Sequence, residues 1–110
     1  MLLQGTLSNT ETSLLTLSTA NVNLLKSFIF FNSSSSNDET IFLYVVKNDG
    51  GSVGVADNSN LIVEQILSFK ETFEFSPAYP IEINQINDSI FAKASTNNTV
   101  NYLISGVEQQ

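Results

Sequence analysis

Two stretches of the chain decide the fold class, Asn23–Asn32 (NLLKSFIFFN) and Thr40–Lys47 (TIFLYVVK). Both are rich in β-branched and aromatic residues, which favour extended backbone, and Asn, Ser, Asp and Gly bound them. Neither shows the spacing of an amphipathic helix. The two stretches therefore predict strands of a sheet protein.

Both stretches carry apolar residues on both faces, whereas a strand of an antiparallel sandwich usually needs only one apolar face. In the first stretch Phe28 and Phe30 share one face; in the second, one face carries Ile41, Leu43 and Val45. The residues on the opposite faces form the candidate interface: Ile29, Phe31, Phe42, Tyr44 and Val46. Either a loop or terminal segment of the same chain covers them, or another protein does, because monomers rarely expose large apolar patches.

Shorter apolar runs on both sides of these stretches predict the remaining strands: Leu2–Leu7, Ser13–Ser18, Val53–Ala56 as a short edge strand, Leu61–Leu67 as a strand or a helical turn, Glu71–Phe75, Ile81–Ile83, Ser89–Ala94 and Val100–Gly106. Asn48–Gly51 and Asn97–Asn98 predict turns, and Pro77 and Pro80 predict an irregular link. Strands spaced about 8–12 residues apart predict an antiparallel β-sandwich of about eight strands, Ig-like or jelly-roll, in one domain spanning residues 1–110.

The composition argues against an enzymatic role. The hydrophobic fraction of 42% argues against disorder, and the sequence contains no Cys, His, Trp or Arg. These absences exclude a disulfide framework, a thiol nucleophile and the usual general base, and they argue against a transition-metal site. A net charge of −7 with four lysines argues against nucleic acid and anionic membrane as partners. We expect a non-enzymatic structural or binding role without a cofactor or a metal.

Several weaker patterns could indicate functional sites, but for each of them we prefer a purely structural explanation. Asp49, with the two glycines after it, and Asp57–Asn60 offer oxygen ligands for Ca²⁺, but their spacing does not match an EF-hand loop and favours turns. Glu71, Glu82 and Asp88 could supply the carboxylate pair of a glycosidase only if the fold brought these distant residues together. Ser68 and Lys70 lack a catalytic spacing. The tyrosines that could stack on sugars are Tyr44, Tyr79 and Tyr102.

The chain as a whole resembles the small β-sandwich virion proteins of tailed bacteriophages, which serve as capsid decoration proteins and as modules of tails or fibres. The resemblance rests on structural motifs of strands and turns: Gln4–Leu7, Leu14–Thr16, Leu24–Phe28, Ile41–Val46, Asn60–Ile62, Glu71–Phe75, Asp88–Ser95 and Val100–Glu108. These motifs span most of the chain. They describe a scaffold rather than a catalytic site.

This resemblance implies a capsid decoration (cement) protein that binds the major capsid protein or other virion proteins. It also implies a homo-oligomer located in the virion and assembled in the host cytoplasm. The start at Met1 lacks the pattern of a signal peptide, and the chain ends soon after its last expected strand, so we expect a stand-alone protein. The alternative is a tail or fibre module that binds host surface glycan.

Overall fold

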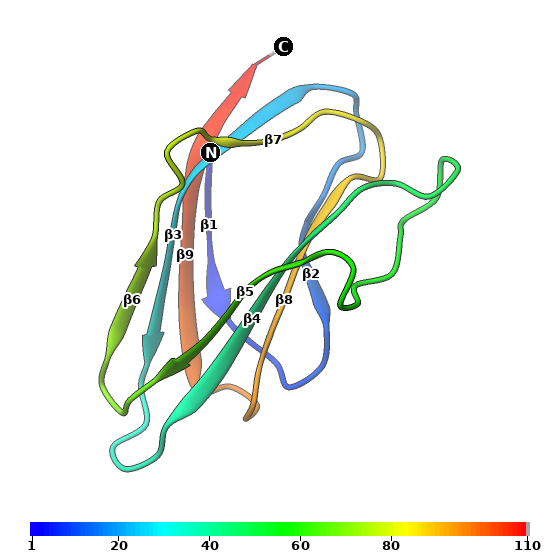
Figure 1. Cartoon of the computed structure of the whole chain (residues 1–110). Helices are drawn as coiled ribbons and strands as arrows, with labels where there is room; N and C mark the ends of the chain where they lie inside the picture. The colour runs from blue at the N-terminus through cyan, green and yellow to red at the C-terminus, as the bar shows by residue number, and fades with distance from the viewer. Residues whose placement is uncertain (110) are drawn as a thin grey trace.

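The computed structural model describes residues 1–109. These residues form nine strands and no helix (Figure 1): β1 (Leu2–Thr6), β2 (Thr12–Thr16), β3 (Val22–Asn32), β4 (Glu39–Val46), β5 (Leu61–Leu67), β6 (Thr72–Phe75), β7 (Ile81–Ile83), β8 (Ser89–Ala94) and β9 (Val100–Gln109). Within this range no helix is long and apolar enough to cross a membrane. The prediction of an all-β fold is confirmed.

The strands form two antiparallel sheets. Sheet A has the order β1-β9-β3-β6, with β7 also paired to β3, and sheet B has the order β2-β8-β4-β5. The strand pairs nest like those of one long hairpin: β1 with β9, β2 with β8, β3 with β6 and β7, and β4 with β5. Such a hairpin, wound so that its pairs alternate between two sheets, is a jelly roll. Of the two sandwich types expected, the strand order is therefore that of the jelly roll.

The core lies between the sheets and comes from their inner faces. Phe28 and Phe30 of β3 are fully buried, as are Ile41 and Leu43 of β4. Their neighbours along each sheet are also inward, because directly paired residues share a face. The other core residues are Leu7, Leu17, Leu25, Leu67, Ile83, Ile90, Ala92, Ala94, Val100 and Ile104. The separation of Phe28 and Phe30 from Ile29 and Phe31 follows the predicted alternation.

The turns between strands follow the expected residues, with one correction. Asn98 has a φ of +62°, and Gly50 and Gly51 have positive φ in the turn that Asp49 and Ser52 close. The prediction of an edge strand at Val53–Ala56 is wrong, because these residues form no ladder with any strand. They belong instead to the segment 47–60, which connects β4 to β5 and packs on Val46 at the end of β4.

Gly106 lies where β3 and β9 approach each other closely, next to a bulge in β3. A Cβ placed on Gly106 would overlap the carbonyl oxygen of Leu24 and would lie 3.0 Å from the Cα of Leu25. These backbone atoms could make room for a Cβ only if β3 and β9 moved apart. We therefore expect Gly106→Ala to lower the free energy of unfolding by roughly 2 kcal/mol in urea denaturation. Ser105→Ala, which adds no atom beside it, is the control, and a Gly106→Ala protein as stable as that control would contradict the close approach.

Candidate functional site

The outer face of sheet A carries apolar side chains along its two central strands. Ile29 and Phe31 point outward from β3 and remain partly exposed. Ile29 lies directly opposite Leu103 of β9, and Leu24 lies directly opposite Val107. We call these residues the apolar stripe: Leu24, Ile29, Phe31, Leu103 and Val107. Two of the five predicted interface residues therefore lie together on this face, and the facing pair Ser27 and Ser105 separates their end of the stripe from Leu24 and Val107.

The borders of the apolar stripe are polar. On the β1 side Gln4 lies opposite Leu103, and on the β6 side Glu74 lies opposite Ile29. Both side chains are exposed. An apolar centre within a polar rim is the usual arrangement of a protein-binding surface.

The outer face of sheet B is different, because this chain covers the part of it around Tyr44 and Val46. Tyr44 is 3% exposed and Val46 is 1% exposed, yet neither belongs to the core between the sheets. Tyr44 lies between Leu61 of β5 and Phe91 of β8. The segment 47–60 packs on Val46 so closely that a Cβ on Gly54 would lie 2.8 Å from the Val46 Cγ1. Of the two alternatives for the second apolar face, cover by the same chain applies to Tyr44 and Val46.

Phe42, the remaining predicted interface residue, is partly exposed but lies beneath a charged pair. The ammonium group of Lys93 lies 4.9 Å from the centre of the Phe42 ring, a cation–π distance. Lys93 also donates a hydrogen bond of 3.1 Å to Glu11, which raises the pKa of Lys93. The Phe42 ring is thus already partnered within the chain. The predicted interface residues therefore divide between two opposite surfaces: Ile29 and Phe31 lie on sheet A, and the other three lie on sheet B.

Asp88 holds the covering segment in place. It is fully buried, and its two carboxylate oxygens accept bonds from Lys47 Nζ at 2.9 Å, from the Asn48 backbone N–H at 3.0 Å and from the Asn48 Nδ2 at 3.3 Å. The backbone N–H groups of Asn84 and Gln85 donate at 3.2 and 3.0 Å. We call these five residues the Asp88 clasp. It joins the end of β4, where the segment 47–60 begins, to the turn before β8.

The clasp also determines the ionisation of Asp88. Burial by itself raises the pKa of a carboxyl group, because it penalises the charged form. Here the hydrogen bonds from Lys47, Asn48, Gln85 and Asn84 outweigh burial, and the pKa of Asp88 lies far below its usual value. The Lys47 side chain is 56% exposed, so solvent weakens its charge–charge attraction. Besides Lys47, the backbone donors of Asn48, Gln85 and Asn84, which are held in place by the fold, stabilise the ionised state.

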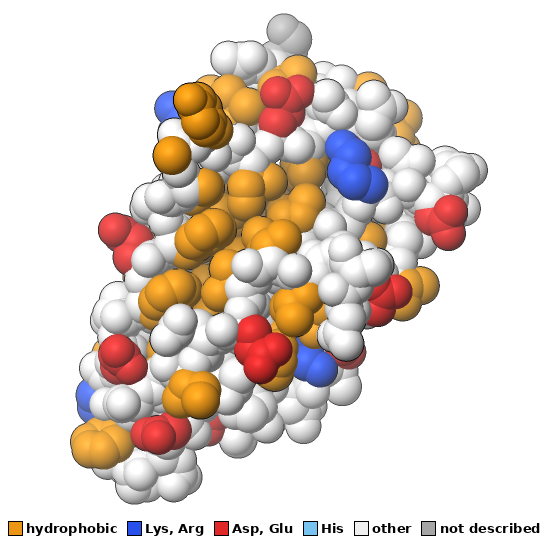
Figure 2. Space-filling view, viewed as in Figure 1, with side chains coloured by type: hydrophobic (Ala, Val, Ile, Leu, Met, Phe, Trp, Pro, Cys, Tyr) orange, Lys and Arg blue, Asp and Glu red, His pale blue; other side chains and the backbone are white. Residues whose placement is uncertain are grey.

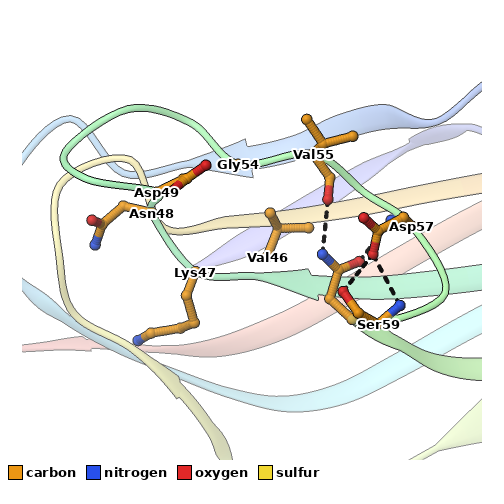
Figure 3. A pocket seen from close by; sticks show the side chains of 9 residues that line it. Val46, Lys47, Asn48, Asp49, Gly54, Val55, Asp57 and Ser59 are labelled. Carbon is orange, nitrogen blue, oxygen red and sulfur yellow. Dashed lines mark hydrogen bonds between the residues drawn. The ribbon is translucent and has the colours of Figure 1, made fainter.

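A cavity of about 450 Å³ opens between the end of β4 and the segment 47–60. Its polar side chains bond to one another (Figure 3): Asp57 accepts hydrogen bonds from the Ser59 backbone N–H and hydroxyl, and Asn60 donates to the Val55 carbonyl. Asn60 also accepts a bond of 2.9 Å from the Asp57 backbone N–H. These contacts shape the loop and leave few free groups to receive a ligand.

The cavity gives no support to a calcium site. Its two carboxylates, Asp49 and Asp57, come from opposite ends of the segment 47–60, and within residues 1–109 no three acidic side chains gather around one point. The hydrogen bonds of Asp57 to Ser59, and the bond from the Gly51 N–H to the Asn48 Oδ1, are those of Asx turns. The preferred explanation of this sequence pattern as turns agrees with the geometry.

The other candidate chemical residues each bond locally. Glu71 accepts a bond from the Ser68 N–H at 2.6 Å, Glu82 accepts one from Asn84 Nδ2 at 2.9 Å, and Asp88 is enclosed in its clasp. Lys70 donates to the Ser33 carbonyl at 3.0 Å rather than to Ser68. These contacts stabilise turns.

The three tyrosines do not share a surface. Tyr44 is buried on the outer side of sheet B, Tyr102 packs against the core, and Tyr79 stands 87% exposed in the link between β6 and β7. A sugar-stacking platform needs aromatic faces that lie beside one another and reach solvent.

Sequence reasoning missed the buried polar residues that join the loops. Asn32 donates from its amide to the carbonyls of Asn37, Leu67 and Ser68, and Asp88 forms the clasp. Both follow or precede a strong apolar run in a chain that is full of Asn, Asp and Ser. Their position at a strand end is a weak signal, since exposed turn residues occupy the same places.

Comparison of this chain with protein-family models, with curated proteins and with solved structures gives no match.

Proposed function

We propose that this chain is a non-enzymatic structural protein of a tailed-bacteriophage virion, where it decorates the capsid by attaching to the major capsid protein or a neighbouring head protein. The observation that carries the proposal is the apolar stripe on sheet A. Burial of apolar surface is worth about 25 cal/mol per Å², so a stripe of five large side chains contributes several kcal/mol when a partner covers it. Attachment to protein is the role that this surface fits.

The fold is compatible with that role without assigning it. Jelly rolls build many viral capsid domains, and they also occur in lectins and cupins. A fold of this kind hosts many functions, so the argument from fold is one of analogy. The resemblance of the strand and turn motifs to phage virion proteins is the second support. The third is that each of the three carboxylates considered for a catalytic pair, Glu71, Glu82 and Asp88, bonds within its own turn or clasp.

Decoration of the head accounts for the surface better than glycan binding at a tail or fibre. A glycan site needs converging free polar groups with an aromatic platform, whereas the polar groups of the cavity bond to one another and the tyrosines lie apart. A decoration protein needs a repeated adhesive surface and a polar remainder. We propose that copies associate around a symmetry axis of the capsid as a homo-oligomer.

The test is attachment to heads. Phage particles that carry the chain are stripped of it, and the purified chain is added back and co-sedimented with the heads. We expect the double variant Ile29→Thr and Phe31→Thr to bind at least about tenfold more weakly, because it removes the centre of the apolar stripe while keeping β-branched residues in β3. Phe69→Thr, which removes an exposed aromatic outside the stripe, is the control.

Two outcomes would overturn the proposal. One is equal head binding by the double variant and the wild type, which would remove the stripe from the interface. The other is a copy number, measured by quantitative mass spectrometry of purified virions, of only a few chains per particle or none. Hundreds of copies per particle support decoration.

A further inference from the structure

The two sheets both end on the same side of the sandwich. Strand β5 is the last strand of sheet B, and strands β6 and β7 end sheet A. Within residues 1–109 none of the three pairs with another strand along its outer side. At seven residues β5 is the longest edge strand. Unpaired backbone groups along such an edge are a template for another strand.

Apolar side chains fill the opening between these edges. Val63 of β5 lies opposite the core residue Leu43, and Phe73 and Phe75 of β6 lie opposite Phe30 and Phe28. These edge residues pack against the core but remain partly exposed. The view in Figures 1 and 2 looks onto this side of the molecule, and Figure 2 shows apolar side chains gathered between β6 and β5. An added strand would cover them with its inward side chains.

The outward side of β5 adds further apolar area. Ile66 is 63% exposed and Ile62 is 43% exposed, and Glu64 lies between them in sequence. Glu64 is directly opposite Phe42, which places it on the outer face of sheet B. A strand that paired with β5 would therefore meet two exposed isoleucines and one carboxylate.

The charges along these edge strands indicate what kind of strand could pair with them. Strands β5, β6 and β7 carry Glu64, Glu74 and Glu82 and contain no lysine. Pairing these edges with the same edges of a second copy would bring carboxylates together, which destabilises cross-strand pairs, and each copy has a net charge of −7. A strand that carries Lys or Arg among apolar residues has the complementary pattern.

We propose that the β5 edge accepts an extended segment of another protein, in which apolar residues alternate with residues that include Lys or Arg. The segment adds a fifth strand to sheet B beside β5. Its inward apolar side chains pack on Val63, Phe73 and Phe75, and a basic side chain pairs with Glu64. This mode of recognition is β-strand addition, in which backbone hydrogen bonds supply affinity and side-chain positions supply selectivity. It uses a surface other than the apolar stripe and is independent of the proposed function.

The test uses the full chain and a synthetic probe, a short peptide with valine at alternate positions and threonine or lysine between them. Fluorescence anisotropy measures its affinity, and hydrogen exchange locates it. We expect saturable binding, slower amide exchange in β5, and loss of binding by a peptide in which the amides that face β5 are N-methylated. In the Glu64→Lys protein we expect affinity to fall about fivefold, and a peptide with glutamate in place of lysine to bind better instead.

Glu64 is exposed, so the variant should fold, and an unchanged thermal transition verifies this. The variant Glu108→Lys, at an exposed carboxylate of β9 outside this edge, is the matched control and should leave the affinity unchanged. Equal binding of the N-methylated peptide, protection of amides elsewhere than β5, or no saturable binding would each overturn the proposal. A dimer of the free chain with protected β5 amides would also overturn it, because it would assign the edge to a second copy. Variants of the apolar stripe leave this binding intact, so the two proposals fail separately.

Discussion

Phe30→Ala is expected to lower the free energy of unfolding by roughly 3–5 kcal/mol in chemical denaturation. Phe30 is fully buried, and its two strand neighbours on the inner face of sheet A are Phe73 and Tyr102. Truncation to Ala removes the apolar area of the ring and leaves a cavity that packed neighbours fill only in part. A loss of this size is a large share of the stability of a domain of 110 residues.

Phe31→Ala is the matched control, since it removes the same ring from the next residue on the opposite face of β3. Phe31 is partly exposed, so its loss is expected to cost distinctly less stability. Equal shifts of the denaturation midpoint for the two variants would contradict the assignment of Phe30 to the core and Phe31 to the apolar stripe.

Asp88→Ala is expected to cost about 3–5 kcal/mol of stability, because it leaves buried donors without an acceptor. The backbone N–H groups of Asn48, Asn84 and Gln85 all lose their carboxylate partner. The segment 47–60 loses the bonds that fix its start, and we expect Val46, on which it packs, to become more accessible. Hydrogen exchange of β4 and of the turn before β8 should accelerate together.

The pH dependence of stability tests the same clasp. The pKa of Asp88 is lower in the folded chain than in the unfolded chain, where it is about 4. The contribution of Asp88 is therefore complete above that pH and is lost as the pH falls below it toward the folded pKa. We expect the stability difference between the wild type and Asp88→Asn to shrink as the pH is lowered from neutral. A difference that stays constant down to low pH would contradict the ionised clasp.

Asp57→Ala provides the control for both measurements. Asp57 is an exposed carboxylate whose hydrogen bonds run only to Ser59, in the same turn. We expect its loss to change stability much less than the loss of Asp88 does. The contrast separates a carboxylate that joins distant parts of the chain from one that shapes a local turn.

The strands could be predicted because their signals are local. The alternation in Asn23–Asn32 and Thr40–Lys47 assigns each side chain to a face, since the side-chain period of a strand is two. The turns at Asn98 and Gly50 could also be predicted, because Asn and Gly tolerate the positive φ that these positions adopt. The exception, Val53–Ala56, has strand-forming residues but no partner strand, because it lies in the segment 47–60, which packs on Val46 instead of extending a sheet edge.

The sequence by itself determined that the chain is a β-sandwich with apolar residues on more than one face of its strands, because both properties follow from the order of neighbouring residues. Only the tertiary structure decided which of those faces is covered. The segment 47–60, fastened by Asp88 from forty residues further along the chain, packs on Val46, and Tyr44 is buried on the same face, whereas Ile29 and Phe31 remain partly exposed. Cover depends on contacts between distant segments, and those contacts arise only when the strands have paired and the loops between them are held in place.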